Sequence, residues 1–332
     1  AKLLAEDGYF TDFISNGVST ELCFVAFCAF TLIIIFAGVQ NGIERVSKIM
    51  MPILIVLSVI IAVYSVTRPG ALAGVKYFLV PNVKNFSWMT VVSAMGQMFY
   101  SLSIAMGILI TFGSYMKKDT AIEDSTRNVE IFDTGIAIMA GLMIIPAVFA
   151  FSGGDPDTLQ AGPSLMFITI PKVFQNMGFG TVIGIVFFLL VLFAAVTSSI
   201  ALTESAVSTF EDELGWGRKK ATVLVGVIML ALGSLSSLGY GPLAGIKIIG
   251  MQFLDLFDFL TNSVMMPIAA LLTSLLVSRV VGIDKIEDEI IHGESAFRRK
   301  KVFVVMIKYL CPVFAIIILL SSVANALGWI KM

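Results

Sequence analysis

"LFAAVTSSIALTES", residues 192–205, lies in one of the most apolar stretches of the chain, yet it carries three adjacent hydroxyl residues, Thr197, Ser198 and Ser199. The apolar run around it, residues 180–203, is long enough to cross a bilayer, which takes about 20 residues. A polar group surrounded by hydrocarbon is costly unless a partner satisfies it. The stretch therefore predicts a membrane-spanning helix whose hydroxyls have either a structural or a functional partner.

The whole chain has the composition of a membrane protein. Of its 332 residues, 58% are hydrophobic and 14% are charged, whereas about a quarter are charged in soluble domains. The mean hydropathy is +0.95. Apolar runs of spanning length occur at roughly 20–39, 50–66, 87–112, 129–152, 180–203, 221–237, 252–278 and 302–328. Because the alternation typical of barrel strands is not seen, we expect an all-α polytopic membrane protein with eight transmembrane helices.

The basic residues are divided unevenly between the loops. Fourteen of the 22 Lys and Arg residues lie in one set of alternate loops, and the positive-inside rule predicts that this set faces the cytoplasm. Both chain ends then lie on the outer side of the cell membrane. Within a single transmembrane domain, 1–332, we expect an outer loop at 1–18, an outer helical hairpin at 153–178 and a cytoplasmic loop at 279–301 that forms an amphipathic helix. A disordered loop is the alternative at 153–178.

Several classes of function are excluded by missing motifs. The sequence has no glycine-rich phosphate loop, no zinc-protease motif and no nucleophile elbow. His292 is its one histidine, so chemistry that needs a histidine cluster is excluded as well. We therefore expect neither an enzyme nor a nucleic-acid-binding protein, and polar residues inside the spans become the functional candidates.

The hydroxyls of the opening stretch have two interpretations. Ala194, Thr197 and Ser198 stand at i, i+3 and i+4, so they share one face of a helix. The two hydroxyls and the Ala194 carbonyl offer oxygen ligands of the kind that a hard monovalent cation such as Na⁺ takes. Alternatively, the hydroxyls bond back to carbonyls of their own helix or let a neighbouring helix approach closely. Periodicity alone leaves both interpretations open.

A second polar group lies in "GQMFYSLSIAMGILITFGSYMKKD", residues 96–119, where Ser101, Ser103 and Gly107 occupy the centre of a span. Hydroxyls and glycine at this depth favour either a discontinuous helix that receives a substrate or a kinked packing site. Asp133 lies at the edge of the next apolar run and is either hydrated at the interface or turned inward to a cation. Ser101 and Asp133 could meet across two packed helices.

Two residues that disturb helices, Gly42 and Pro52, flank the start of another span. Pro52 removes a backbone donor and Gly42 relaxes the chain, so the helix between them could unwind at little cost. An ordinary helix start is the alternative.

Taken together, these residues resemble the neurotransmitter:sodium symporter family, whose bacterial members include amino-acid transporters. The motifs that carry the resemblance are "GIERVSKIMMP", "GQMFYSLSIAMG", "GSYMKKD", "AGPSLMFITIPKVF", "FAAVTSSIALTES" and "FEDELG". They occur in the family's order and at its spacing over nearly the whole chain. The resemblance implies a bacterial transporter with inverted helical repeats, of which this chain holds family helices 4 to 11 and lacks helices 1 to 3.

The resemblance also implies roles for single positions. The implied ligands are Ser101 and Asp133 for sodium site 1, and Ala194, Thr197 and Ser198 for sodium site 2. The implied substrate-binding residues are Tyr100, Ser101, Ser103, Met106, Ser198 and Leu202. The implied gates are Gln97 with Asp258 on the outer side and Tyr115 with Asp212 on the inner side. The implied unwinding pair is Gly42 and Pro52. Ala105 and Met106 depart from the family pattern, which leaves pocket size and local flexibility open.

The function implied by the resemblance is sodium-coupled symport of a neutral, hydrophobic amino acid by alternating access. Asp133 stands where chloride-dependent relatives have Asn, so its fixed charge predicts chloride independence. No cofactor is expected beyond Na⁺ as the coupling ion. The expected partners are the amino acid, sodium ions and the lipid bilayer, with a second copy of the chain as a further candidate. The alternatives are a non-transporting scaffold or sensor and a proton-coupled antiporter that uses Asp133.

Overall fold

The computed structural model describes residues 6, 8–83, 86–153, 162–294, 296–326 and 328–329. Over these residues the regular secondary structure is helical, apart from one isolated bridge between Ile248 and Met251. Seven helical segments are long and apolar enough to cross a membrane: Gly17–Phe36, Val39–Val66, Ile122–Ser152, Gly180–Leu214, Arg218–Leu238, Phe253–Val281 and Lys300–Ala326. They correspond to seven of the eight apolar runs, and the remaining run, 87–112, forms two shorter helices.

Along the chain, the described residues form the following helices. The first half of the chain contains α1 (Tyr9–Ser15), α2 (Gly17–Phe36), η2 (Val39–Glu44), α3 (Arg45–Val66), α4 (Ala71–Leu79), α5 (Trp88–Ser101), α6 (Ile108–Ser114) and α7 (Ile122–Ser152). The second half contains η5 (Leu165–Thr169), α8 (Ile170–Gln175), α9 (Gly180–Leu214), α10 (Arg218–Leu238), α11 (Phe253–Asp258), η6 (Phe259–Met265), α12 (Met266–Leu275), η7 (Leu276–Val281), α13 (Ile283–Gly293), α14 (Lys300–Val305), η8 (Met306–Leu310) and α15 (Cys311–Ala326). The η segments are π-helical turns that continue the neighbouring α-helices.

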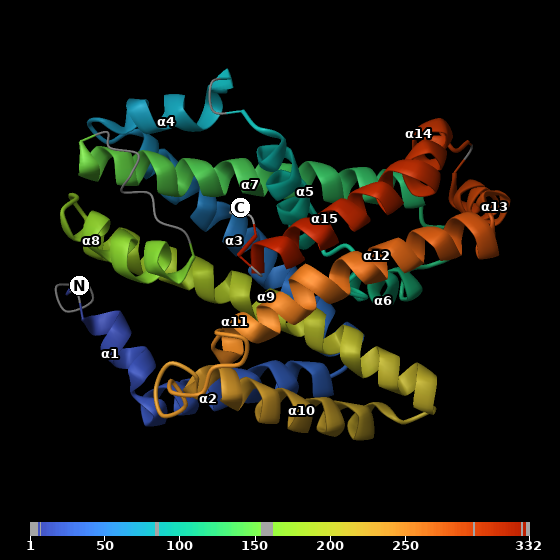
Figure 1. Cartoon of the computed structure of the whole chain (residues 1–332), viewed down its shortest axis with the longest axis horizontal. Coiled ribbons are helices and arrows are strands. Elements are labelled where there is room, and N and C mark those ends of the chain that lie inside the picture. Colours follow the sequence, from blue (N-terminus) through green and yellow to red (C-terminus); the bar gives the residue numbers. More distant parts are fainter. Residues whose placement is uncertain are drawn as a thin grey trace. The chain divides into compact units, whose positions relative to one another are not determined.

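The described chain forms two compact units (Figure 1). The first unit comprises Ala1–Val83 and Thr134–Lys247, and the second comprises Lys84–Asp133 and Ile248–Met332. Both units therefore combine stretches that are far apart in the sequence. The boundary falls inside α7, so this helix contributes its first turns to the second unit and the rest to the first.

The core of the first unit lies between α3, α7, α8 and α9. Its fully buried side chains include Ile61, Ala147, Val173 and Phe187. In α3 the buried Ser65 hydroxyl donates a hydrogen bond of 2.7 Å to a carbonyl of α7, that of Met143. A polar group inside the core is thus satisfied across two helices, as burial requires.

In the same unit, α2 and α10 run side by side (Figure 1). Gly233 of α10 faces the ring of Phe24, and a Cβ atom at this glycine would lie 2.1 Å from Phe24 Cζ. Small residues at helix contacts let the backbones of membrane helices approach closely. The glycine therefore leaves room for the Phe24 ring at this contact.

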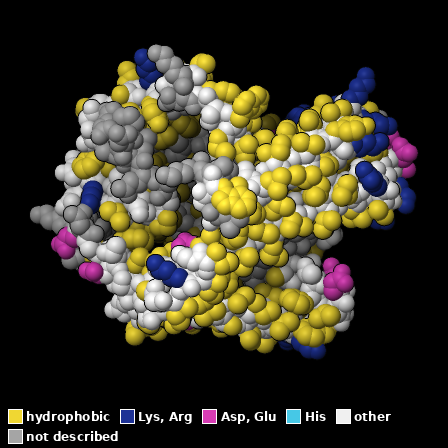
Figure 2. All heavy atoms as spheres, in the orientation of Figure 1, with side chains coloured by type: hydrophobic (Ala, Val, Ile, Leu, Met, Phe, Trp, Pro, Cys, Tyr) yellow, Lys and Arg dark blue, Asp and Glu magenta, His cyan; other side chains and the backbone are white. Residues whose placement is uncertain are grey.

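The second unit has a smaller core between α5, α12 and α15. Phe99 packs there against Met266, Ala270, Ala315 and Ile318. Figure 2 shows that the side chains over α12 and α15 are almost all apolar and that Lys and Arg gather at the end formed by α13 and α14. This distribution suits helices that cross hydrocarbon and end in water.

Helix is present in all three expected loops, including residues 1–18, where the sequence predicts none. In residues 1–18, α1 forms and α2 already begins at Gly17. In residues 153–178, the segment Leu165–Gln175 is a short apolar helix, and the other arm of the expected hairpin, at 154–161, lies outside the described residues. In residues 279–301, α13 has an amphipathic pattern and buries Ile290.

A buried ion pair joins three helices of the first unit. Glu204 of α9 is completely buried, and the Arg218 guanidinium donates two hydrogen bonds to its carboxylate, at 3.0 and 2.6 Å. Arg218 also donates to the carbonyl of Ile35 at the end of α2, at 3.0 Å. Bidentate geometry with further hydrogen bonds is what makes a buried charge tolerable.

Removing the charge of Glu204 should destabilise the fold. Glu204→Gln leaves the guanidinium of Arg218 without its buried carboxylate, so we expect the free energy of unfolding in detergent to fall by about 3 kcal/mol. Glu213→Gln is the matched control, because Glu213 is exposed near the end of the same helix. Denaturant unfolding of both variants measures the difference, and equal stabilities would show that the ion pair does not stabilise the protein.

Candidate functional site

The span at 87–112 is broken at its centre. The helix α5 ends at Ser101, α6 begins at Ile108, and residues 102–107 between them are not helical. Three residues of this segment, Ser103, Ala105 and Gly107, have positive φ angles of 54°, 63° and 78°. Of the two interpretations that the sequence left open, the structure therefore has the discontinuous helix.

The break is a strained conformation for two of these residues. Left-handed backbone suits glycine, but it costs other residues about 1 kcal/mol or more. Ser103 and Ala105 adopt it all the same. Strain of this kind is found at functional sites, where the surrounding structure maintains it. Within a membrane, an interrupted helix occurs where it lines a cavity or holds a ligand.

Ser101 and Asp133 meet at the end of α5. The Ser101 hydroxyl donates a hydrogen bond of 2.6 Å to Asp133 Oδ1. Ser101 is the last residue of α5, and Asp133 projects from α7 within the same compact unit. A carboxylate, a hydroxyl and the negative end of a half-helix thus come together, which is an arrangement that attracts a cation.

Three further residues of the implied site surround a pocket in the second unit. Gln97, Tyr100 and Asp258 line a cavity of about 340 Å³ between α5, α11, η6 and α15. Asp258 Oδ1 accepts a hydrogen bond of 2.6 Å from the amide of Asn262. The two residues that the sequence assigns to the outer gate therefore face one cavity.

On α9, the three adjacent hydroxyls diverge. Thr197 donates to the carbonyls of Phe193 and Ala194, both at 3.0 Å. Ser199 turns to the other side of the helix and shares a hydrogen bond of 3.0 Å with Thr31 of α2. Ser198 is exposed. The alternative of back-bonding thus describes Thr197, and the alternative of interhelical packing describes Ser199.

The three implied ligands of the second sodium site lie on one face of α9. The Thr197 hydroxyl and the Ala194 carbonyl are 3.0 Å apart, and Ser198 follows directly. Thr197 and Ala194 are half-buried, whereas Ser198 and Leu202 are exposed on the first unit.

The other implied positions lie in several places. Ser103 and Met106 lie in the break, Tyr115 caps the end of α6, and Asp212 is exposed in the last turns of α9. The substrate-binding set is thus divided, because Tyr100, Ser101, Ser103 and Met106 belong to the second unit and Ser198 and Leu202 to the first.

The segment from Gly42 to Pro52 is helical throughout in this structure. A Cβ atom at Gly42 would lie 2.2 Å from the Ile34 carbonyl oxygen, so this glycine is required for close packing against the end of α2. Pro52 lies inside α3 and interrupts its hydrogen bonding. That this segment unwinds remains a prediction.

Sequence reasoning overlooked two carboxylates inside apolar runs. Glu204 pairs with Arg218, and Glu21 of α2 accepts hydrogen bonds of 2.5 Å from Ser234 and Ser237 of α10. An acidic residue within a span is itself a signal that a partner exists. Arg218 lies 14 residues after Glu204 on the next helix, and Ser234 and Ser237 lie 213 and 216 residues after Glu21. The pattern around each glutamate does not reveal these partners.

These features define a class of protein before any comparison. Membrane-spanning helices, one of them broken at its centre with oxygen atoms gathered at the break, are typical of secondary transporters. The family model described as "Sodium:neurotransmitter symporter family" matches residues 12–329. The chain therefore belongs to the sodium:neurotransmitter symporter family, as its sequence motifs predict.

Individual relatives agree with this assignment. An uncharacterised sodium-dependent transporter of Bacillus subtilis, YhdH, is 33% identical over 95% of this chain and 69% of its own length. One from Methanocaldococcus jannaschii is 30% identical over 78% of this chain and 52% of its own length. The crystal structure of MhsT in complex with L-phenylalanine matches with a TM-score of 0.82 and 34% identity, over 95% of this chain and 70% of MhsT. The expected all-α symporter fold is confirmed, and the chain spans about half to 70% of the length of these proteins.

The strain at Ala105 can be measured directly. Ala105→Gly should stabilise the protein or leave its stability unchanged, because glycine adopts a φ of 63° without steric cost. Ala94→Gly, in the interior of α5, is the matched control and should destabilise it by about 1 kcal/mol. Thermal unfolding in detergent compares the two. If Ala105→Gly lowers the melting temperature as much as Ala94→Gly does, residue 105 is not in left-handed backbone.

Proposed function

We propose that the complete protein is a sodium-coupled symporter of a neutral, hydrophobic amino acid that works by alternating access and needs no chloride. The observation that carries this proposal is the contact between Ser101 and Asp133 at the end of a broken membrane helix. It places a negative charge and a hydroxyl at the point where the helix interruption exposes backbone groups. Membership of a sodium symporter family supports Na⁺ as the cation.

The first sodium ion would bind at Ser101 and Asp133. Ionised carboxylate and hydroxyl oxygens are ligands that suit a hard cation, and carbonyls of an unwound segment can complete its shell. The hydrogen bond of 2.6 Å already holds the two side chains together. The ion would therefore need little rearrangement of these ligands.

The second sodium ion would bind at Ala194, Thr197 and Ser198. The Thr197 hydroxyl can offer a lone pair to an ion while it still donates a hydrogen bond to the Phe193 carbonyl of its own helix. Back-bonding and ion binding are therefore compatible at this residue.

The proposed substrate class is supported by the residue types of the implied binding site and by the similarity of the chain to MhsT. The implied substrate residues Tyr100, Met106 and Leu202 are apolar or aromatic, and Ser101, Ser103 and Ser198 add a few hydroxyls. Pockets of this kind suit a small ligand with an apolar side chain. MhsT, which resembles this chain over most of its length, binds L-phenylalanine in its crystal structure.

Binding of sodium and binding of the amino acid would be coupled. Sodium would favour the state that is open outward, and substrate would then permit closure, so the affinity for each ligand depends on the other. The membrane potential supplies about 2.3 kcal/mol per charge per 100 mV. Gln97 with Asp258, and Tyr115 with Asp212, would gate the two sides, and unwinding between Gly42 and Pro52 would open the inner path.

Thr197→Val tests the second sodium site. Valine keeps the shape of threonine but removes the oxygen ligand, so we expect at least a tenfold loss of sodium-driven amino-acid uptake in proteoliposomes, the size of a lost strong charge-assisted contact. Thr209→Val on the same helix is the control, because Thr209 also bonds back to its own helix, at 2.8 Å. Equal uptake by the two variants would contradict the assignment.

The uptake assay also separates the alternatives. Uptake driven by a proton gradient without sodium would favour the proton-coupled antiporter, with Asp133 as its carrier. Ligand binding without any accumulation would favour a sensor.

Chloride independence has its own test. Because the Asp133 carboxylate supplies a fixed negative charge, replacing chloride by gluconate should leave the uptake rate within about 20% of its value, as electrostatic compensation at one site requires. Asp133→Asn removes that charge and should abolish sodium-driven uptake in either anion. Strong loss of wild-type uptake in gluconate would contradict this part of the proposal.

A further inference from the structure

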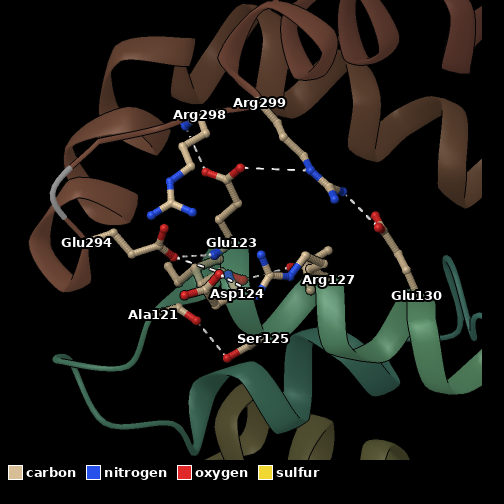
Figure 3. Close-up of polar contacts among 11 residues, drawn as sticks. Ala121, Glu123, Asp124, Ser125, Arg127, Glu130, Glu294, Arg298 and Arg299 are labelled. Carbon is tan, nitrogen blue, oxygen red and sulfur yellow. Dashed lines mark hydrogen bonds and ion pairs between the residues drawn. The ribbon is translucent and has the colours of Figure 1, made fainter.

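The start of α7 is capped by a residue from a distant segment (Figure 3). Glu294, directly after α13, accepts hydrogen bonds from the backbone N–H groups of Glu123 at 2.6 Å and Asp124 at 3.3 Å. N–H groups in the first turn of a helix have no partner within the helix. The negative charge also interacts favourably with the helix dipole. Glu294 therefore fixes the position of the first turn of α7.

Two further contacts extend this connection along α7. The backbone N–H of Arg298 donates to Glu123 Oε2 at 2.8 Å, and the Arg299 guanidinium donates to Glu130 Oε2 at 2.8 Å. Figure 3 shows Arg299 between Glu123 and Glu130, two turns apart on the helix. The Arg299 guanidinium is charged at physiological pH, and its hydrogen bond to Glu130 raises its pKa further. We call Glu294, Arg299 and their partners Glu123, Asp124 and Glu130 the α7 clamp.

The approach of the two segments is close. A Cβ atom at Gly293 would lie 2.6 Å from the Thr120 carbonyl oxygen, so only glycine fits beside the chain that leads into α7. Lys300 pairs with Glu287 and ties α13 to the start of α14. The clamp is therefore attached to a supported segment and not to an isolated loop.

The clamp is connected to both helices that carry the ligands of the first sodium site. Arg299 immediately precedes α14, which continues through η8 into α15. The core of the second unit packs α5, through Phe99, against Ala315 and Ile318 of α15. Apolar packing thus holds α5, which carries Ser101, against α15. The clamp holds the first turns of α7, which carries Asp133, beside the residues that precede α14.

Because α7 is a continuous helix, the clamp at its start also influences the position of Asp133. At a rise of 1.5 Å per residue, Glu130 lies only about 4.5 Å along the axis from Asp133. A tilt or rotation of α7 would move the Asp133 carboxylate relative to the Ser101 hydroxyl, and ligand positions must hold to within about 0.5 Å for binding. We infer that Glu294 and Arg299 are positioning residues for the sodium ligand Asp133, an inference that rests on the proposed sodium-coupled function.

The test compares neighbouring arginines. Arg299→Gln should raise the sodium concentration for half-maximal binding of labelled amino acid by about two- to fivefold, the range that a partly exposed ion pair allows. Arg298→Gln should leave it unchanged, because among the described residues no hydrogen bond or ion pair involves the Arg298 side chain. The two substitutions remove the same charge, so the comparison cancels the general electrostatic effect.

A second pair of variants tests the cap. Glu294→Ala should raise the same sodium concentration by about three- to tenfold, the effect of a lost helix cap. Glu289→Ala, at an exposed position on α13, should have no effect. Glu130→Gln removes one partner of Arg299. The double variant with Arg299→Gln should be no worse than Arg299→Gln alone, since that substitution already removes the contacts with both Glu130 and Glu123.

The outcomes distinguish this inference from a purely structural role and from the proposed function. Substrate affinity at saturating sodium should be unchanged in all clamp variants. A lower melting temperature with an unchanged sodium requirement would show that the clamp only stabilises the fold, and would overturn the inference. Binding in the wild type that does not depend on sodium would instead overturn the proposed function.

Discussion

The structure depends on the rule that polar groups inside a membrane must find partners within the protein. Most spans obey it through uninterrupted helices, but the span at 87–112 stops at Ser101 and restarts at Ile108. The hydroxyl of Ser101 is satisfied by Asp133 at 2.6 Å. The Asp133 carboxylate thus lies beside the interruption, where we propose that it binds a cation. The proposed function depends on this cation being an ion that can be exchanged.

The two units meet the same rule in different ways. In the first unit, hydroxyls and carboxylates are satisfied within or between helices, as Ser65, Thr197 and the pair of Glu204 with Arg218 show. These contacts fix the scaffold. In the second unit, a clamp of charged residues at the start of α7 and a small apolar core around Phe99 hold the helices that flank the break. The proposed ion ligands thus lie on helices whose positions are fixed by contacts away from the break.

The sequence predicts the spans well, because hydrophobic length is a local property. It also predicts that the helix is interrupted or kinked near Ser101, Ser103 and Gly107, because hydroxyls and glycine in an apolar run can be read directly from the sequence. The contact between Ser101 and Asp133 was expected from the same residues and is present. Whether sodium binds there, or at Ala194, Thr197 and Ser198, is a prediction that the structure does not test. The partner of Glu204 on the next helix, and the partners of Glu294 at 171 and 170 residues' distance, were not foreseen, because the local hydrophobic pattern does not indicate either contact.

The central claim is that Asp133 holds a sodium ion at the break. Equilibrium binding of ²²Na⁺ to the purified complete protein, in the presence of saturating amino acid, measures it most directly. The account predicts that replacing Asp133 with alanine removes one bound ion per protein while the ion at Thr197 remains. An unchanged number of bound ions in a folded variant would contradict it.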